Sequence, residues 1–313
     1  MWSLFPALLM GWSLGANDAA NVFGLGVAVR AVRYWTAVCL TATAALLGAY
    51  LSGAAGMATY TALASQGLRS SFCVALAAGL TVTVMTWRGL PVSTTQAAVG
   101  AILGVALATG REVEWGVLMR VVLSWITSPV AALAIAYVLH RVVSPLVERK
   151  LAGLLWYDRT MRLGIIVIGI WGAYALGANN VANVTGVYVG AGVLSVPVAA
   201  LVGGASIALG VLTFSRPVME TVGERLVSLG TWPALLAVTA QATVLQAFSL
   251  IGVPVSASQA VVGAVVGIGL VKGVAAVNVR QLVAIFAGWV LTPLGAGVVG
   301  YLLWLGVGRF LPG

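Results

Sequence analysis

The decapeptide Gly15-Ala-Asn-Asp-Ala-Ala-Asn-Val-Phe-Gly24 ("GANDAANVFG") places one aspartate and two asparagines inside an otherwise apolar N-terminal segment. A closely similar decapeptide, "GANNVANVTG" at residues 177–186, lies inside another apolar segment further along the chain. A single polar decapeptide could be a loop, but the same pattern embedded in two spans indicates an internal repeat. The pair therefore predicts a duplicated chain in which each half buries one copy of the motif.

The composition excludes a soluble protein. Of 313 residues, 61% are hydrophobic and only 7% are charged, and the mean hydropathy is +1.07. A soluble domain has about 25% charged residues, so this chain cannot cover a water-facing surface. Continuous apolar runs of about 20 residues, the length of a membrane-spanning helix, recur along the whole sequence. They predict an all-α integral membrane protein that contacts the lipid bilayer, rather than a β-barrel built from short alternating strands.

The net charge of +9 is interpreted as membrane topology and not as a sign of nucleic-acid binding. Ten spans are predicted, at 2–28, 34–53, 71–87, 92–109, 115–140, 163–190, 193–213, 232–250, 255–270 and 281–308. If both termini face outward, the outer connections carry only Arg69, Arg111 and Arg309. The cytoplasmic connections then carry Arg30, Arg33, Arg88, Arg141, Arg149, Lys150, Arg159, Arg162, Arg216, Arg225, Lys272 and Arg280. This positive-inside bias predicts a multi-pass protein of the plasma membrane with the linker 141–162 in the cytoplasm.

Two further matches extend the repeat over the whole chain. "PVSTTQAAVGAILG" from Pro91 matches "PVSASQAVVGAVVG" from Pro254, and "WITSP" from Trp125 matches "WVLTP" from Trp289. The halves 1–140 and 163–313 each hold about five segments, an odd number, so the second half enters the membrane from the opposite side. Segments 71–109 and 232–270 can each either cross fully or form a re-entrant hairpin. The predicted fold is a pair of inverted-topology repeats.

Inverted repeats are typical of secondary transporters, whose sites lie at broken helices near the middle of the membrane. In "PVSTTQ", Pro91 interrupts one helix, and Ser93 or Thr94 can cap the next one. The free N–H groups of a capped helix start form a natural anion site. "PVSASQ" repeats this arrangement in the second half.

Asp18 is the most informative single residue. It is the only one of seven acidic residues that lies well inside an apolar span. A carboxylate in lipid is costly, and by default it marks a pathway for an ion or a proton. A purely structural aspartate at a helix break is the alternative. One histidine, no pair of carboxylates and no cluster of metal ligands argue against an enzyme, and no cofactor is expected beyond a coupling ion.

Together, "GANDAANVFG", "GANNVANVTG", "PVSTTQ" and "PVSASQ" resemble the paired signatures of the inorganic phosphate transporter (PiT) family. The resemblance covers both halves and implies symport of inorganic phosphate with Na⁺ or H⁺. By position it implies cation binding, with Na⁺ as the metal, at Asp18, Asn21, Asn180 and Asn183. It implies phosphate binding at Asn17, Ser93, Thr94, Thr95, Gln96, Asn179, Ser256, Ser258 and Gln259.

One departure from this family and two open alternatives remain. Many relatives carry aspartate in both signatures, whereas this chain has Asn180 opposite Asp18. The fixed charge is thereby halved, and the number of coupled cations is open. Transport of sulfate or another tetrahedral oxyanion, and a channel function, are the alternatives to phosphate symport. The oligomeric state, including a homodimer, is not determined by the sequence.

Overall fold

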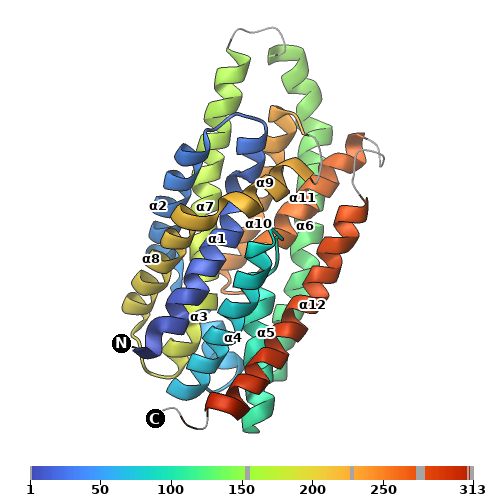
Figure 1. The fold of residues 1–313 in the computed structure, drawn as a ribbon. Coiled ribbons are helices and arrows are strands. Elements are labelled where there is room, and N and C mark those ends of the chain that lie inside the picture. The colour runs from blue at the N-terminus through green and yellow to red at the C-terminus, as the bar shows by residue number, and fades with distance from the viewer. Residues whose placement is uncertain (1, 152–155, 226–228, 273–278, 309, 311–313) are drawn as a thin grey trace.

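The chain folds into a bundle of α-helices, seen in a computed structural model that describes residues 2–151, 156–225, 229–272, 279–308 and 310 (Figure 1). No strand occurs within these residues. A short 3₁₀ turn, Trp2–Leu4, precedes the first helix. The helices are α1 (Phe5–Ala28), α2 (Tyr34–Ser52), α3 (Ala54–Leu63), α4 (Leu68–Trp87), α5 (Thr94–Thr109), α6 (Trp115–Leu151), α7 (Tyr157–Gly190), α8 (Val196–Phe214), α9 (Arg216–Arg225), α10 (Thr231–Leu250), α11 (Ala257–Lys272) and α12 (Val279–Leu303).

Seven of the described helices are long and apolar enough to cross a membrane, which makes this a multi-pass membrane protein. Helices α5 and α11 are apolar too, but each has only 16 residues. At 1.5 Å per residue each is about 24 Å long, which is shorter than the hydrocarbon core of about 30 Å. Each follows a longer helix, α4 or α10, with which it forms a hairpin.

The segments that lead from the two hairpin tips into α5 and α11 are buried in the interior of the bundle. Val92 and Ser93 precede α5, Val255 and Ser256 precede α11, and all four side chains are almost fully buried. Figure 1 shows the α4–α5 tip near the middle of the molecule and not at one end. This geometry favours the re-entrant alternative over two full crossings.

The helix contacts of the first half recur in the second half. Helix α1 packs against α4, α8 and α9, and α7 packs against the corresponding α10, α2 and α3. Likewise α6 packs on α11, and α12 packs on α5. The halves thus interlock. In Figure 1, α1 ascends from the N-terminus whereas α7 descends from the top, the directions that the inverted repeat requires. The inversion itself stays a prediction.

Two short helices, α3 and α9, were not predicted as separate elements. Within the described residues, each half therefore has six α-helices where the sequence suggested about five segments. Helix α3 continues the apolar run of α2 beyond a break at Gly53, so the two pieces together resemble one segment in the sequence. Helix α9, "RPVMETVGER", carries several charges and looks like a connection. The break and the charges explain why neither short helix has the pattern of a spanning helix.

Glycines of the repeated motifs allow helices from different halves to touch. A Cβ atom on Gly15 would lie 2.0 Å from the carbonyl oxygen of Ile207, and one on Gly177 would lie 1.9 Å from that of Ala45. These contacts join α1 to α8 and α7 to α2. Small residues at such crossings let helix backbones approach closely in a membrane. The first glycine of each decapeptide therefore fixes the position of the polar residues that follow it.

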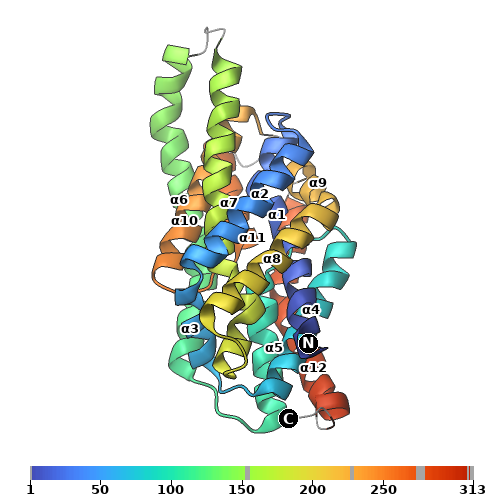
Figure 2. The ribbon, with the colours of Figure 1, turned by 90° about the vertical axis from the view of Figure 1, so that its left-hand side faces the viewer.

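The predicted linker is largely a continuation of two helices. Residues 141–151 extend α6 and residues 157–162 extend α7, while residues 152–155 and Arg309 of the predicted topology lie outside the described residues. Figure 2 shows the long ends of α6 and α7 projecting together at one end of the bundle. Helix α1 begins and α12 ends toward the opposite end. This is the relative placement that the topology predicts.

Candidate functional site

A serine caps the helix start at each hairpin tip. In α5, the Ser93 hydroxyl accepts a hydrogen bond of 3.2 Å from the Gln96 backbone N–H. At the start of α11, Ser256 accepts an equivalent 3.2 Å bond from the Gln259 N–H. Such a cap satisfies one free N–H of the first turn, and the others remain available to a ligand. Of the two cap candidates in the first half, the structure assigns the role to Ser93.

The two helix starts bind each other. The Thr95 hydroxyl donates to the Val255 carbonyl oxygen at 3.0 Å, and the Ser258 hydroxyl donates to the Val92 carbonyl oxygen at 3.0 Å. These bonds correspond in the repeat, because Thr95 aligns with Ser258 and Val92 aligns with Val255. The hydroxyls of Ser256 and Ser258 also lie 2.9 Å apart. Hydroxyl groups from both halves therefore gather where the hairpins meet.

Asn17 fastens the first hairpin to α1. Its Oδ1 accepts from the Val92 N–H at 3.1 Å, and its Nδ2 donates to the Leu90 carbonyl and to Thr86 Oγ1, each at 3.0 Å. These bonds occupy the amide, so we assign Asn17 to positioning the helix start. Direct contact of this side chain with substrate stays a prediction.

Asn179 does the same for the second hairpin. Its Oδ1 accepts from the Val255 N–H at 3.1 Å, and its Nδ2 donates to the Val253 carbonyl oxygen at 3.3 Å. Leu90 and Val92 align with Val253 and Val255, so the two asparagines make equivalent bonds. The second asparagine lacks a counterpart to the Thr86 bond.

Asp18 lies one residue beyond the first of these asparagines and receives hydrogen bonds from two neutral groups. Its Oδ1 accepts from Asn21 Nδ2 at 3.1 Å, and its Oδ2 accepts from Thr94 Oγ1 at 2.8 Å. The Asn21 Oδ1 atom is buried without a hydrogen-bond partner. This corner thus offers a carboxylate and a free amide oxygen, the oxygen donors that a hard cation prefers.

The corresponding corner of the second half is arranged differently. The Asn180 Oδ1 atom accepts from Asn183 Nδ2 at 2.8 Å, and the same Nδ2 lies 3.1 Å from Thr95 Oγ1. The Tyr60 hydroxyl donates to Asn183 Oδ1 at 2.5 Å. The Asn180 Nδ2 group is buried and has no partner.

All thirteen site residues predicted from the sequence are buried, and none is more than 4% exposed. The hydrogen bonds above link all four motifs, so α1, α7 and the two hairpins form one polar cluster inside an apolar bundle. Tyr60 and Thr86 also contact this cluster. The sequence did not predict them as site residues, because both lie outside the repeated motifs. Comparison of the halves could have drawn attention to Tyr60, which aligns with Val222.

Gln96 and Gln259 connect the cluster to a cavity of about 480 Å³ between α6 and α12. The walls are mainly apolar and include Trp125 and Trp289. The side-chain Oε1 atoms of both glutamines and the indole N–H groups of both tryptophans are buried without partners. The glutamines therefore keep hydrogen-bonding capacity free at the edge of the site.

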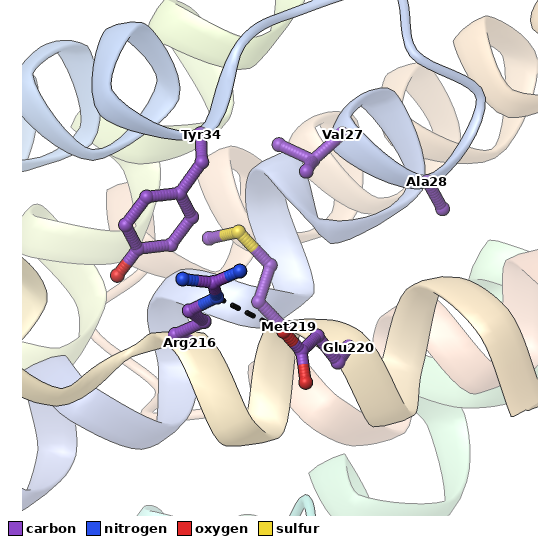
Figure 3. Close-up of a pocket in the computed structure, with 6 residues that line it drawn as sticks. All are labelled: Val27, Ala28, Tyr34, Arg216, Met219 and Glu220. Carbon is purple, nitrogen blue, oxygen red and sulfur yellow. Dashed lines mark hydrogen bonds and ion pairs between the residues drawn. The ribbon is translucent and has the colours of Figure 1, made fainter.

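Two further cavities lie outside the cluster. Arg88 and Pro91 line one of about 240 Å³ between the α4–α5 tip and α12, which places this arginine beside the first hairpin. The second, of about 190 Å³, lies where α1, α2 and α9 meet (Figure 3). There Arg216 pairs with Glu220 at 3.0 Å and lies over the Tyr34 ring. None of the motif residues lines this second cavity.

Comparison with known proteins identifies a family and individual relatives. A family profile described as "Phosphate transporter family" matches residues 14–300. A Pyrococcus furiosus protein named "Putative phosphate permease" is 28% identical, over 93% of this chain and 92% of that protein. A Bacillus subtilis protein named "Sulfate permease" is also 28% identical, over 97% of this chain and 85% of that protein.

The fold also matches a solved structure. That structure is described as a sodium-dependent phosphate transporter, and it is 24% identical in sequence with a TM-score of 0.86. The match covers 99% of this chain and 100% of that one. The fold is therefore shared along nearly the whole length of both chains.

Proposed function

Because this chain belongs to the phosphate transporter family, we propose that it imports inorganic phosphate by symport with a cation through the polar cluster where its four motifs meet. Alternating access of this cluster to the two sides of the membrane is part of the proposal, as in other transporters with inverted repeats. The observation that carries it is the joining of two capped helix starts to a helix that bears a buried carboxylate.

Each part of the cluster has a chemical role in the proposal. The capped starts of α5 and α11 supply N–H and hydroxyl donors to an oxyanion. Asp18 and Asn21 supply oxygen ligands to the cation, whose charge offsets that of the buried carboxylate. Gln96 and Gln259 supply acceptors for a proton on the anion, because their Oε1 atoms have no donor of their own.

Sodium is the proposed coupling ion, with H⁺ as the alternative. The structural neighbour is described as sodium-dependent, and the Asp18 corner offers oxygen ligands that suit Na⁺. We further propose that the protein lies in the plasma membrane with both termini outside and the α6–α7 linker in the cytoplasm. This orientation rests on the distribution of arginine and lysine.

Sulfate is the second candidate substrate, favoured by the name of the Bacillus subtilis relative. Phosphate and sulfate share a tetrahedral shape, but near neutral pH only phosphate retains a proton with which to donate a hydrogen bond. A site built around a particular hydrogen bond can reject an analogue that lacks it by about 10⁴–10⁵-fold. Free acceptors at Gln96 and Gln259 therefore favour phosphate.

Uptake into proteoliposomes tests the proposed function. Labelled phosphate should accumulate when a Na⁺ or an H⁺ gradient is imposed separately, and the effective gradient identifies the coupling ion. Excess arsenate, which also keeps a proton, should compete well, and excess sulfate should compete poorly. Purely downhill flux would indicate a channel, and equal competition by sulfate would place the oxyanion alternative first.

A further inference from the structure

Three of the differences between aligned residues of the two halves change which polar groups lie around the cluster. Asp18 aligns with Asn180, and Thr94 aligns with Ala257. Tyr60 of α3 corresponds to Val222 of α9. The packing agrees with this third pairing, because Gly186 of α7 lies against Tyr60 and the equivalent Gly24 of α1 lies against Val222.

These differences leave oxygen lone pairs free in the first half. The Thr94 hydroxyl donates to the Asp18 carboxyl group, whose oxygens have further lone pairs. No tyrosine stands opposite Asn21, since the aligned residue is Val222, and Asn21 Oδ1 remains buried without a donor. The free groups of this half are therefore those that bind a cation.

The same positions leave a donor free in the second half. The Tyr60 hydroxyl occupies Asn183 Oδ1, and Asn183 Nδ2 occupies Asn180 Oδ1. Ala257 has no hydroxyl, and Asn180 Nδ2 is buried without an acceptor. A buried N–H group without a partner is destabilising, and an oxygen of a bound anion would satisfy it.

We propose that the two halves divide the work: the first half holds a single coupling cation at Asp18, and the second binds an oxygen of the anion through Asn180. This proposal rests on the proposed function and assigns it a ratio of one cation per anion. A neutral amide neither balances a second cation nor carries a proton, so the ratio holds for Na⁺ and for H⁺ alike.

The cation-to-anion ratio, measured from the cation and phosphate gradients at which net uptake into proteoliposomes is zero, tests this division. The wild-type chain should give a ratio of about one, since a single carboxylate lies at the predicted mid-membrane site. The double variant Asn180→Asp with Ala257→Thr rebuilds the chemistry of the first half, and its ratio should rise to about two. A wild-type ratio of two, or an unchanged ratio in the folded double variant, would overturn the proposal.

The single variant Asn180→Leu isolates the role of the free N–H group. The anion KM should rise about tenfold or more, while the ratio and the cation affinity stay as in the wild type. An unchanged anion KM would contradict the assignment of Asn180. Leucine nearly preserves the side-chain volume and introduces no charge, so this variant remains informative if the double variant does not fold.

A binding measurement separates failure of this inference from failure of the proposed function. Na⁺ should raise the thermal unfolding temperature of the detergent-solubilised protein. If H⁺ is the coupling ion, acidification should produce the equivalent rise in this temperature. The shift should disappear in Asp18→Asn and persist in Asn180→Leu. A shift lost in both variants would overturn the division of labour. Absence of any coupled uptake by the wild type would instead count against the symport proposal.

Discussion

Helices α1 and α7 carry the same residues where they contact neighbouring helices and hairpins. They carry different residues at a position that is proposed to bind ions. Gly15 and Gly177 make equivalent close contacts, and Asn17 and Asn179 fasten equivalent hairpins. One position beyond each asparagine the two helices differ, with Asp18 in α1 and Asn180 in α7. These duplicated residues form a common frame, and in our proposal the residues that differ determine which ion each half binds.

The largest effect on stability is expected from variants that disrupt the close helix contacts at the duplicated glycines. Gly177→Ala places a Cβ atom 1.9 Å from the Ala45 carbonyl oxygen, and the helices must separate. Overpacking of this kind costs about 1–3 kcal/mol of stability. The thermal unfolding temperature should fall sharply, and Gly15→Ala should do the same in the other half.

Gly295→Ala in α12 is the matched control, because nothing lies within 4 Å of the added Cβ. Alanine is favoured over glycine in a helix by about 1 kcal/mol, so this variant should be neutral or slightly stabilised. If Gly177→Ala were equally neutral, close approach of α2 and α7 would not be what the repeated glycine provides.

A large effect on selectivity is expected at the paired glutamines. Replacing Gln96 and Gln259 together by leucine removes the free acceptors that we assign to the proton of phosphate. Competition by sulfate should increase relative to wild type by at least about tenfold. Inhibition curves for sulfate against labelled phosphate measure the change, and an unaltered curve would move the acceptor role to another residue.

Replacement of Asn17 or Asn179 should lower stability moderately, and by different amounts. Asn17 makes three hydrogen bonds to the first hairpin, and Asn179 makes two to the second. With about 0.5–1.5 kcal/mol per bond, Asn17→Ala should be more destabilising than Asn179→Ala by about 1 kcal/mol. Thermal unfolding measures this difference, and Thr86→Val should by itself reproduce most of it.

The smallest effect is expected at Arg88, beside the first hairpin tip. Its charge faces a cavity and is exposed, so it attracts anions without binding them tightly. Arg88→Gln should raise the phosphate KM by roughly two- to threefold at low ionic strength and less at high salt. The aligned Ile251→Gln is the control and should leave KM unchanged. A loss of all uptake in Arg88→Gln would instead place the arginine in the site.

The repeated motifs made much of this arrangement predictable. Apolar runs indicated the helices, and Pro91 and Pro254 indicated where two helices break and restart. The position after Pro91 predicted a cap at Ser93 or Thr94, and the structure assigns it to Ser93. Each of these features is local in the sequence, which is why a pattern can reveal it.

Other features depend on contacts between distant segments and carry no local pattern. Two of the three hydrogen bonds of Asn17 go to backbone groups of the first hairpin, and the third goes to Thr86 Oγ1. Only folding brings these groups near Asn17, so the sequence could not reveal them. Tyr60 belongs to α3, whose residues appear in the sequence as an extension of α2. Its bond to Asn183 becomes visible only when α3 packs on α7.

Uptake by Asp18→Asn tests the central claim, that the carboxylate of the first half couples a cation to the anion. Wild-type protein and variant are reconstituted in parallel, and labelled phosphate is followed under the same imposed cation gradient. We predict that the wild type concentrates phosphate inside the vesicles, whereas the variant, equally well folded and inserted, does not concentrate it at all. Accumulation by the variant at the wild-type rate and to the wild-type level would show that Asp18 is structural and would contradict the account.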